Sequence, residues 1–132
     1  MNVLQNMTRA VRPGGAILDL QAIRPNPRVE RDGELICEID GSPLLDQADA
    51  ATAAVNALIS TGRLSEAGRD DHDVRKHYPD GRDLVDDFRD KARQLPKDAI
   101  PRLNAIRQSL VVRERCRLRR LTVTCDQEAV DR

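Results

Sequence analysis

The turn Pro13-Gly14-Gly15 joins two stretches with different hydrophobic patterns, and this constrains the start of the fold more than any other feature. Before it, residues 2–12 carry apolar side chains at helical spacing, which predicts an amphipathic helix. Proline suits the second position of a tight turn, and glycine supplies the positive φ that follows. After the turn, residues 16–23 alternate between a wholly apolar face and a mixed one. This pattern predicts a strand covered on both faces.

Turn-forming residues set the expected limits of the next elements. Arg24-Pro25-Asn26-Pro27 is expected to end the first strand, because proline cannot donate to a ladder. A small hairpin is predicted within residues 28–42, around Asp32-Gly33. Ser42-Pro43 is expected to cap and open the clearest helix, which carries an apolar stripe and ends at Gly62.

The second half of the chain predicts a strand, two helices and a final strand. Residues 70–78 form a short polar strand candidate, and helices are expected over residues 82–94 and 98–109. Residues 110–123 alternate apolar side chains with arginines, which favours a strand. We expect one domain over residues 1–123 and a flexible tail over 124–132.

Composition argues against several classes of function. The 132 residues carry 22 basic and 22 acidic side chains, so no net field draws the chain to a polyanion. One Phe, one Tyr and no Trp leave no aromatic platform for stacking bases, which argues against a nucleic-acid partner. No apolar run reaches the roughly 20 residues that cross a bilayer, and no signal peptide opens the chain. We therefore expect a cytoplasmic protein without a membrane partner.

The cysteines and histidines give little support to a metal or a catalytic site. Cys37, Cys116 and Cys125 form no CxxC pair, and only two histidines are present, so we expect no metal site. His72 and His77 are five residues apart, which places them on opposite faces of a strand. We interpret both as solvated rather than as a general base, and Cys116 as a small core residue.

The run Arg9-Ala10-Val11-Arg12-Pro13-Gly14-Gly15, which passes directly into Ala16-Ile17-Leu18-Asp19-Leu20, resembles part of the class I S-adenosylmethionine-dependent methyltransferases. In that family a Leu-Arg-Pro-Gly-Gly type turn joins a helix to the fifth strand, and Val11 stands where leucine is common. The resemblance implies an α/β fold that is the C-terminal half of a Rossmann-like sheet. Its last three strands would form a mixed sheet with flanking helices, and residues 110–123 would lie antiparallel between the fifth and sixth strands.

The family binds S-adenosylmethionine in its other half, at a glycine-rich loop that follows the first strand. The sequence has no GxGxG, and Gly14-Gly15 precede a strand rather than open a helix after one. The resemblance therefore implies this cofactor for full-length members, but we expect no cofactor-binding residue and no cofactor in this chain alone. The chain looks like a truncated or degenerate relative.

Two groups of residues are candidates for binding. Gln21 and Arg24, with Asp19 nearby, would lie at the carboxyl end of the first strand, where open α/β sheets bind substrates. The alternative, which we favour, is a polar edge that faces water. Pro13-Gly14-Gly15 is assigned a structural role as a turn. Four alternating arginines of the final strand could bind phosphate, but we favour a solvated face paired with acids in residues 80–98. They are Arg113, Arg115, Arg117 and Arg119.

Two functions follow as hypotheses, and no catalytic residue can be assigned to either. The first is the C-terminal portion of a methyltransferase that acts on a small molecule and is inactive alone. Methyl transfer in this family depends mostly on positioning the acceptor, so it requires few fixed residues. The second is a non-catalytic module that forms a homo-oligomer or complements another subunit through a bare edge of the first strand. A basic nucleic-acid binder is a third reading, against which net neutrality argues.

Overall fold

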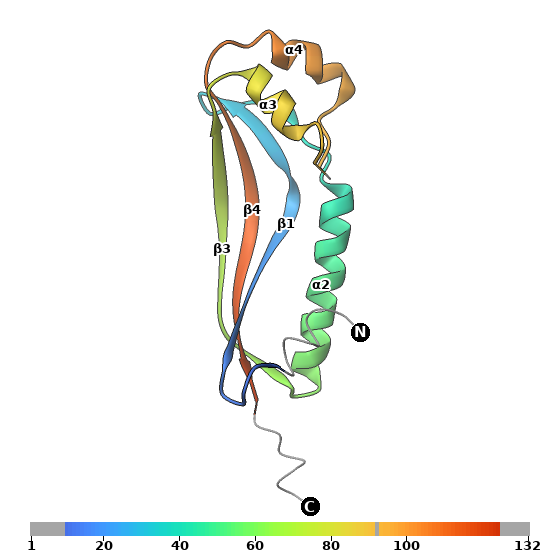
Figure 1. Cartoon of the computed structure of the whole chain (residues 1–132), viewed down its shortest axis with the longest axis vertical. Coiled ribbons are helices and arrows are strands. Elements are labelled where there is room, and N and C mark those ends of the chain that lie inside the picture. Colours follow the sequence, from blue (N-terminus) through green and yellow to red (C-terminus); the bar gives the residue numbers. More distant parts are fainter. Residues whose placement is uncertain (1–9, 92, 125–132) are drawn as a thin grey trace, which may run out of the picture. The chain divides into compact units, whose positions relative to one another are not determined.

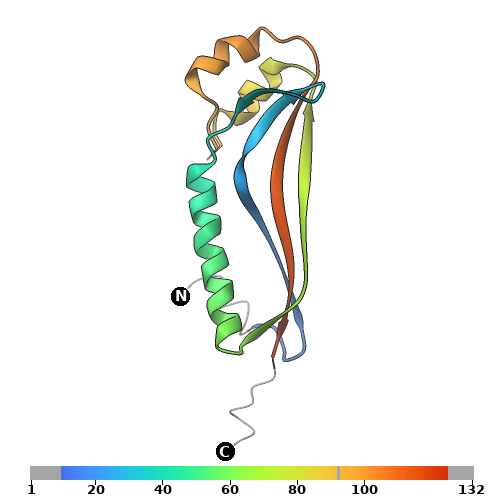
Figure 2. The same ribbon diagram turned by 180° about the vertical axis from the view of Figure 1, so that it is seen from behind.

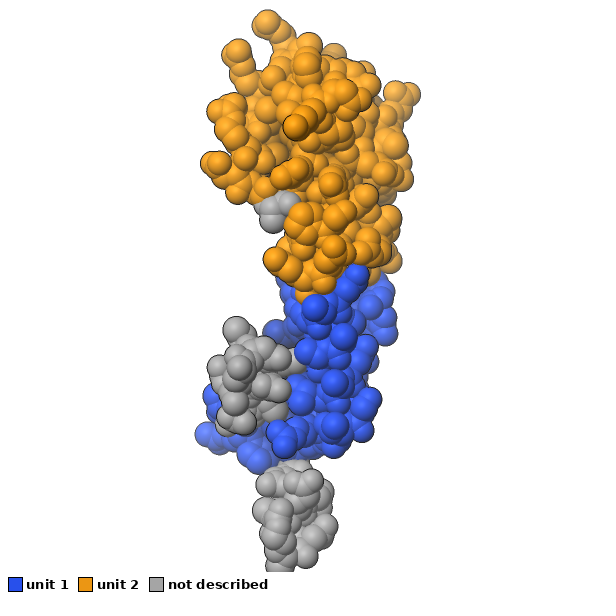
Figure 3. Space-filling model, turned by 90° about the vertical axis from the view of Figure 1, so that its right-hand side faces the viewer, with its two compact units in different colours: residues 1–21, 49–71, 117–132 blue, residues 22–48, 72–116 orange. Residues whose placement is uncertain are grey.

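A computed structural model describes residues 10–91 and 93–124 of the chain. Its contacts group the chain into two compact units (Figure 3). Unit 1 comprises Met1–Gln21, Asp49–Asp71 and Arg117–Arg132, and unit 2 comprises Ala22–Ala48 and His72–Cys116. Each unit has its own apolar core, and the expectation of one domain over residues 1–123 stays a prediction.

The chain forms a mixed α/β structure with one four-stranded sheet in the order β2-β1-β4-β3 (Figure 1, and from behind in Figure 2). The strands are β1 (Ala16–Arg31), β2 (Glu34–Glu38), β3 (Leu64–Tyr78) and β4 (Leu110–Val123). β4 lies between β1 and β3, as expected for the final strand. The expectation of a mixed sheet was wrong, because every strand runs antiparallel to its neighbours. β1 and β3 run the same way, but β4 separates them.

The turn before β1 is confirmed in detail. Gly14 has a φ of 84°, and the Gly15 N–H donates to the Arg12 carbonyl at 2.8 Å. A Cβ on Gly15 would lie 2.5 Å from the Val11 Cγ1, so only glycine fits there. The Gly14 N–H then donates to the Val123 carbonyl at 2.8 Å, which joins the turn to the end of β4. The helix predicted over residues 2–12 lies largely outside the described residues.

The prediction that the first strand ends at its two prolines was wrong, since β1 continues to Arg31. The Pro27 carbonyl accepts from the Ile39 N–H at 2.8 Å, so the nitrogen of Pro27 points to the same side, away from β4. The nitrogen of Pro25, two residues earlier, points to that same side. The missing N–H groups therefore fall on the side of β1 where no β4 ladder bond is lost, which is where a sheet tolerates proline.

The predicted hairpin around Asp32-Gly33 is confirmed. The two residues have φ values of 52° and 82°, the pattern of a type I′ turn, and they join β1 to β2. β2 pairs antiparallel with β1 only over Arg28–Arg31.

Unit 1 has an aliphatic core between the sheet and the C-terminal part of helix α2 (Ser42–Ser60). The buried members of this core come from β1, α2, β3 and β4; they are Ile17, Val55, Leu64, Leu121 and Val123. α2 ends as predicted: Gly62 has a φ of 80°, and the Arg63 N–H donates to the Leu58 carbonyl at 3.0 Å. The start of α2 differs, because Asp40 accepts from the Ser42 N–H at 3.0 Å in place of a Ser42 cap.

Unit 2 packs three short helices against its part of the sheet. They are α3 (Gly81–Phe88), η1 (Lys97–Ala99) and α4 (Ile100–Asn104). The helices predicted over residues 82–94 and 98–109 were too long. α3 ends early because Gln94 forms an antiparallel bridge with Asp40, and the chain after α4 turns so that the Ile106 carbonyl can accept from the Gly81 N–H at 2.9 Å.

The last strands also differ from their predicted limits. β3 begins at Leu64 rather than at residue 70. Along β4 the buried residues are even-numbered at Val112 and Cys116 but odd-numbered at Leu121 and Val123. Thr124, where the tail was expected to begin, donates its N–H to the Arg63 carbonyl at 3.1 Å, and residues 125–132 lie outside the described part.

Candidate functional site

The most distinctive feature of unit 1 is a side of β1 that carries no strand. β4 lies on one side of β1, and β2 pairs on the other side only over Arg28–Arg31. Among the described residues, no strand therefore pairs with β1 on that side from residue 16 to residue 21, the part of β1 that belongs to unit 1. We call this stretch the β1 edge.

The bond between Gly15 and β4 identifies which backbone groups point outward. The N–H and C=O of one residue point to the same side of a strand, and the side alternates along the chain. The Gly15 carbonyl accepts from the Val123 N–H of β4 at 2.9 Å, so at the start of β1 the odd-numbered residues direct their backbone groups to β4. Leu18 and Leu20 therefore present outward N–H and C=O groups, whereas Ile17, Asp19 and Gln21 direct theirs to β4.

The side chains of Leu18 and Leu20 are unusually exposed, at 67% and 60%. The expectation that both faces of this strand would be covered was wrong, since only the face of Ile17 is buried, beneath α2. The β1 edge thus combines free backbone groups with large apolar side chains.

Gln21 and Arg24, the predicted substrate-side residues, lie inside β1 rather than at its carboxyl end, because the strand continues to Arg31. Gln21 belongs to unit 1, where its amide nitrogen donates to the Asp19 Oδ1 at 2.9 Å. Arg24 belongs to unit 2, where it pairs with Asp46 on α2 at 3.2 Å, with both side chains exposed. The structure does not bring them to one cavity, and their substrate-side role stays a prediction.

The four alternating arginines of β4, at positions 113, 115, 117 and 119, are paired with acids, as expected, but the partners lie on β3 and β1 and not in residues 80–98. In unit 2, Arg113 pairs with Glu30 at 2.7 Å and Arg115 with Asp73 at 3.1 Å. The hydrogen bond from Arg115 holds the pKa of Asp73 below its usual range. These guanidinium groups are engaged with carboxylates, which argues against a phosphate-binding stripe.

In unit 1 the same strand continues the pattern with one exception. Arg117 makes two hydrogen bonds to Asp71, at 2.8 and 3.0 Å. Arg119 is only 5% exposed, so the prediction of a solvated side chain was wrong there. It donates to Asn56 on α2 at 3.1 Å and to Glu66 at 3.3 Å.

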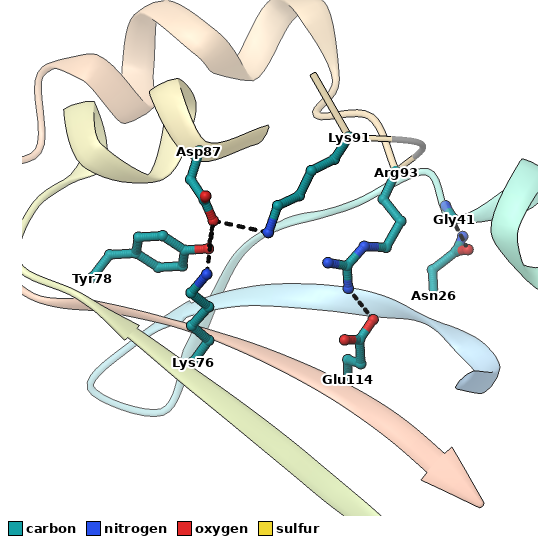
Figure 4. A network of polar contacts seen from close by, with 8 residues as sticks. All are labelled: Asn26, Gly41, Lys76, Tyr78, Asp87, Lys91, Arg93 and Glu114. Carbon is teal, nitrogen blue, oxygen red and sulfur yellow. Dashed lines mark hydrogen bonds and ion pairs between the residues drawn. The ribbon is translucent and has the colours of Figure 1, made fainter. Parts of the chain in front are cut away.

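A polar cluster in unit 2 was missed by the sequence reasoning (Figure 4). The Oδ2 atom of Asp87 on α3 accepts from the Tyr78 hydroxyl, from Lys76 at 3.0 Å and from Lys91 at 2.9 Å. These contacts join the end of β3 to α3 and to the chain that follows α3. The i,i+4 spacing of Asp87 and Lys91 was the one signal in the sequence that could have indicated part of it.

The electrostatics of this cluster indicate a structural role. Burial and the hydrogen bond to Asp87 raise the pKa of the Tyr78 hydroxyl. The hydrogen bonds from Tyr78, Lys91 and Lys76 lower the pKa of Asp87. Tyr78 thus stays protonated and Asp87 stays ionised, and each satisfies the other. Neither group is poised to exchange a proton with a substrate near neutral pH.

Unit 2 also has a shallow groove of about 390 Å³ between the β2–α2 connection and the chain before η1. Its lining combines apolar residues with polar ones, which include Asn26, Asp40 and Gln94. Asp40 is engaged with Ser42, which lowers its pKa, and Asn26 accepts from the Gly41 N–H at 3.3 Å. The polar groups of this groove therefore hold the start of α2.

The remaining candidates carry no site in the described part of the chain. No group of three or more His, Cys, Asp or Glu side chains is placed to hold a metal ion there. Cys37 and Cys116 are buried free thiols whose pKa burial raises, which opposes a nucleophilic role. His72 and His77 both lie on β3, as predicted. Among the described helices, none is long and apolar enough to cross a membrane.

Comparisons with protein-family models, with curated proteins and with solved structures found no match to this chain.

Proposed function

We propose that this chain is a non-catalytic interaction module that binds another polypeptide by strand addition at the β1 edge. The observation that carries the proposal is the row of outward backbone groups that includes Leu18 and Leu20, which no described strand covers. Sheets that avoid pairing protect such an edge with lysine, proline or a bulge. The stretch from Ala16 to Ile23 contains no lysine and no proline.

The side chains support recognition of an extended strand. Strand addition derives its affinity from main-chain hydrogen bonds and its specificity from alternate side chains. Leu18 and Leu20 offer apolar surface on one face. Asp19 and Gln21 offer a carboxylate and an amide on the other.

Hydrogen exchange followed by mass spectrometry tests this proposal, with a peptide of alternating valine and threonine as the probe strand. We expect the peptide to slow exchange within residues 16–21, because the outward amides gain partners. The double variant Leu18→Lys, Leu20→Lys should lose this protection. Leu35→Lys, at an exposed leucine of β2, should keep it. Exchange that stays fast with the peptide, and at every chain concentration, would contradict the proposal.

A second candidate is the C-terminal portion of a small-molecule methyltransferase. Two observations favour it. β4 lies antiparallel between β1 and β3. The Pro13-Gly14-Gly15 turn leads directly into β1. In this reading the rest of the sheet, with the S-adenosylmethionine site, would join at the β1 edge. Calorimetric titration with S-adenosylmethionine separates the two: we expect no binding heat from this chain alone, and tight binding would overturn that expectation.

A further inference from the structure

We infer that the β1 edge has two registers on β4, one residue apart, and that the shift between them exposes or hides Leu18 and Leu20. The structure shows the register in which both leucines face solvent. The inference rests on the proposed function, because it names how that same edge is regulated. A shift by one residue turns every side chain of a strand to the other face.

Two backbone bonds to β4 define the observed register. The Val123 N–H donates to the Gly15 carbonyl at 2.9 Å, and the Val123 carbonyl accepts from the Gly14 N–H at 2.8 Å. Two residues therefore oppose one. Gly14 also has a positive φ of 84°, so this is a β-bulge whose first residue is a left-handed glycine.

Regular antiparallel pairing beyond the bulge places Ile17 opposite Leu121 and Asp19 opposite Arg119. The first pair agrees with the core of unit 1, in which both of its residues are buried beneath α2. Opposed residues point to the same face of a sheet. Asp19 and Arg119 therefore share the face that α2 covers.

The observed register thus covers the more polar face of the edge. Asp19 lies on the covered face, whereas the wholly apolar face, with Ala16, Leu18 and Leu20, is exposed. The Oδ2 atom of Asp19 and the Nε atom of Arg119 are buried without a hydrogen-bond partner. Exposed leucines and unpaired buried polar atoms both raise the free energy of a register. Such a conflict between sequence and fold brings a competing arrangement close in free energy.

The bulge supplies the residue that the shift requires. When Gly14 alone opposes Val123, the Val123 N–H donates to the Gly14 carbonyl in place of the Gly15 carbonyl. The extra residue of the bulge then moves from the start of the β1 edge to its end, after Gln21. We call this arrangement the shifted register. One hydrogen bond changes its acceptor at the start of the edge, and the turn before it keeps its glycines.

The shifted register reverses what is buried. Leu18 and Leu20 then face α2, and Asp19 faces solvent, where water hydrates both oxygens of its carboxylate. Ile17 leaves the core in exchange, and Arg119 keeps its hydrogen bonds to α2 and β3. Each register therefore satisfies groups that the other leaves exposed or unpaired, which makes the edge a two-state element.

The shift regulates the edge because only one register presents apolar side chains to a partner. In the observed register Leu18 and Leu20 offer both outward backbone groups and exposed side chains. In the shifted register their side chains lie beneath α2, and the outward backbone groups belong to Ile17 and Asp19. A partner strand that contacts the leucines binds the observed register more tightly and raises its population.

Nuclear magnetic resonance tests the shift in the unmodified chain, through relaxation dispersion and saturation transfer, which detect exchange on the μs–ms timescale. We expect exchange at the amides of residues 16–21 in the free chain, and its suppression by a saturating amount of the valine–threonine peptide. Asp19→Leu should lower the population of the shifted register at least ~10-fold, because it makes the covered face of the observed register apolar. Leu35→Ala, at an exposed leucine of β2, should leave the exchange unchanged.

Disulfide trapping identifies the two registers, in a Cys125→Ser background that keeps the two buried cysteines. The pair Leu18→Cys, Arg120→Cys faces across the strands in the observed register, and the pair Ile17→Cys, Arg120→Cys does so in the shifted one. Each is a non-hydrogen-bonded pair, in which the Cα atoms are about 4.5 Å apart, a distance that a disulfide spans.

Both cysteine pairs should form an intramolecular disulfide on mild oxidation. A saturating amount of the valine–threonine peptide should slow the Ile17 pair at least ~10-fold and leave the Leu18 pair unaffected, because the peptide holds the observed register. The pair Asp19→Cys, Arg120→Cys is the control, since these positions do not face each other in either register and should not cross-link.

Cross-linking of the Leu18 pair alone, in a chain that shows no exchange at residues 16–21, would overturn the inference. If the valine–threonine peptide still protects residues 16–21 in that case, the proposed function stands and only its regulation is wrong. Registers that exchange equally with and without a protecting peptide would also overturn the inference, because the shift would then regulate nothing. If both registers form but the peptide gives no protection, the proposed function is wrong and its regulation falls with it.

Discussion

The two units close their cores by different means. Unit 2 contains both aromatic residues of the chain, Tyr78 and Phe88, with ring centroids 6.4 Å apart. The Asp87 cluster and the packing of α3 on α4 hold its helices over them. Unit 1 has an aliphatic core under one helix and leaves Leu18 and Leu20 exposed. In unit 2 the polar groups bind one another and stabilise the fold. In unit 1 the backbone groups of the β1 edge and the side chains of Leu18 and Leu20 remain exposed to a partner.

The largest expected effect comes from Gly81→Ala, which attacks the packing of unit 2. A Cβ at Gly81 would lie 1.7 Å from the Leu103 carbonyl oxygen, a main-chain atom that cannot move aside alone. We expect a loss of about 3 kcal/mol or more in the free energy of unfolding, measured by urea denaturation. Gly68→Ala in unit 1 is the control, because its nearest neighbour would be 4.0 Å away. Equal stability of the two variants would show that α3 and α4 do not pack as described.

The next effect concerns the buried charge of unit 1. Glu66→Ala removes the carboxylate that pairs with Arg119 and leaves that guanidinium buried with Asn56 alone. The expected cost is about 2 kcal/mol, since a buried charge without its partner is destabilising. Asp71→Ala, beside the less buried Arg117, should cost only about 0.5 kcal/mol. If both changes cost the same, Arg119 is not the buried ion of unit 1.

A smaller effect is expected from Tyr78→Phe in unit 2. The ring keeps its contact with Phe88, and only the hydroxyl that donates to Asp87 is lost. We expect a cost of about 1 kcal/mol, the usual net value of one hydrogen bond, from thermal or urea unfolding. A neutral result would mean that Lys76 and Lys91 satisfy Asp87 without the tyrosine.

The smallest effect is confined to acid pH. The pKa of Asp87 is lowered in the folded chain, so its contribution is fully present above the unfolded value of about 3.9 and is lost as pH falls toward the folded value. The urea midpoint of the native chain should therefore fall below about pH 4 more steeply than that of Asp87→Asn. Parallel pH profiles for the two proteins would remove this role of Asp87.

Features set by local chemistry could be predicted from the sequence. The Pro13-Gly14-Gly15 turn, the Asp32-Gly33 hairpin and the Gly62 end of α2 each depend on glycine or on a short polar residue in a positive φ. Such positions have few alternatives, so a single residue type identifies them. The alternation of apolar residues and arginines over residues 110–123 predicted β4 correctly, because a repeat of two residues is typical of a strand.

Features that depend on distant partners could not be predicted in this way. The prolines at 25 and 27 read as a strand end, because the sequence does not show which side of a strand lacks a partner. α3 was expected to reach residue 94, and only the bridge from Gln94 to Asp40 explains its earlier end. The β1 edge was anticipated as a consequence of the family resemblance, but the exposure of Leu18 and Leu20 was not, since an apolar face ordinarily indicates burial.

The change of buried parity along β4 has a practical consequence for mutational scanning. Before Cys116 the odd-numbered positions should tolerate charged substitutions, and after Arg119 the even-numbered positions should tolerate them. The pattern of tolerated positions therefore inverts within one strand. A complete substitution map would then locate the boundary between the two units from growth or abundance data alone. Removing a single residue at 117 or 118 would move every later side chain to the opposite face of the strand, and would turn Leu121 and Val123 toward water.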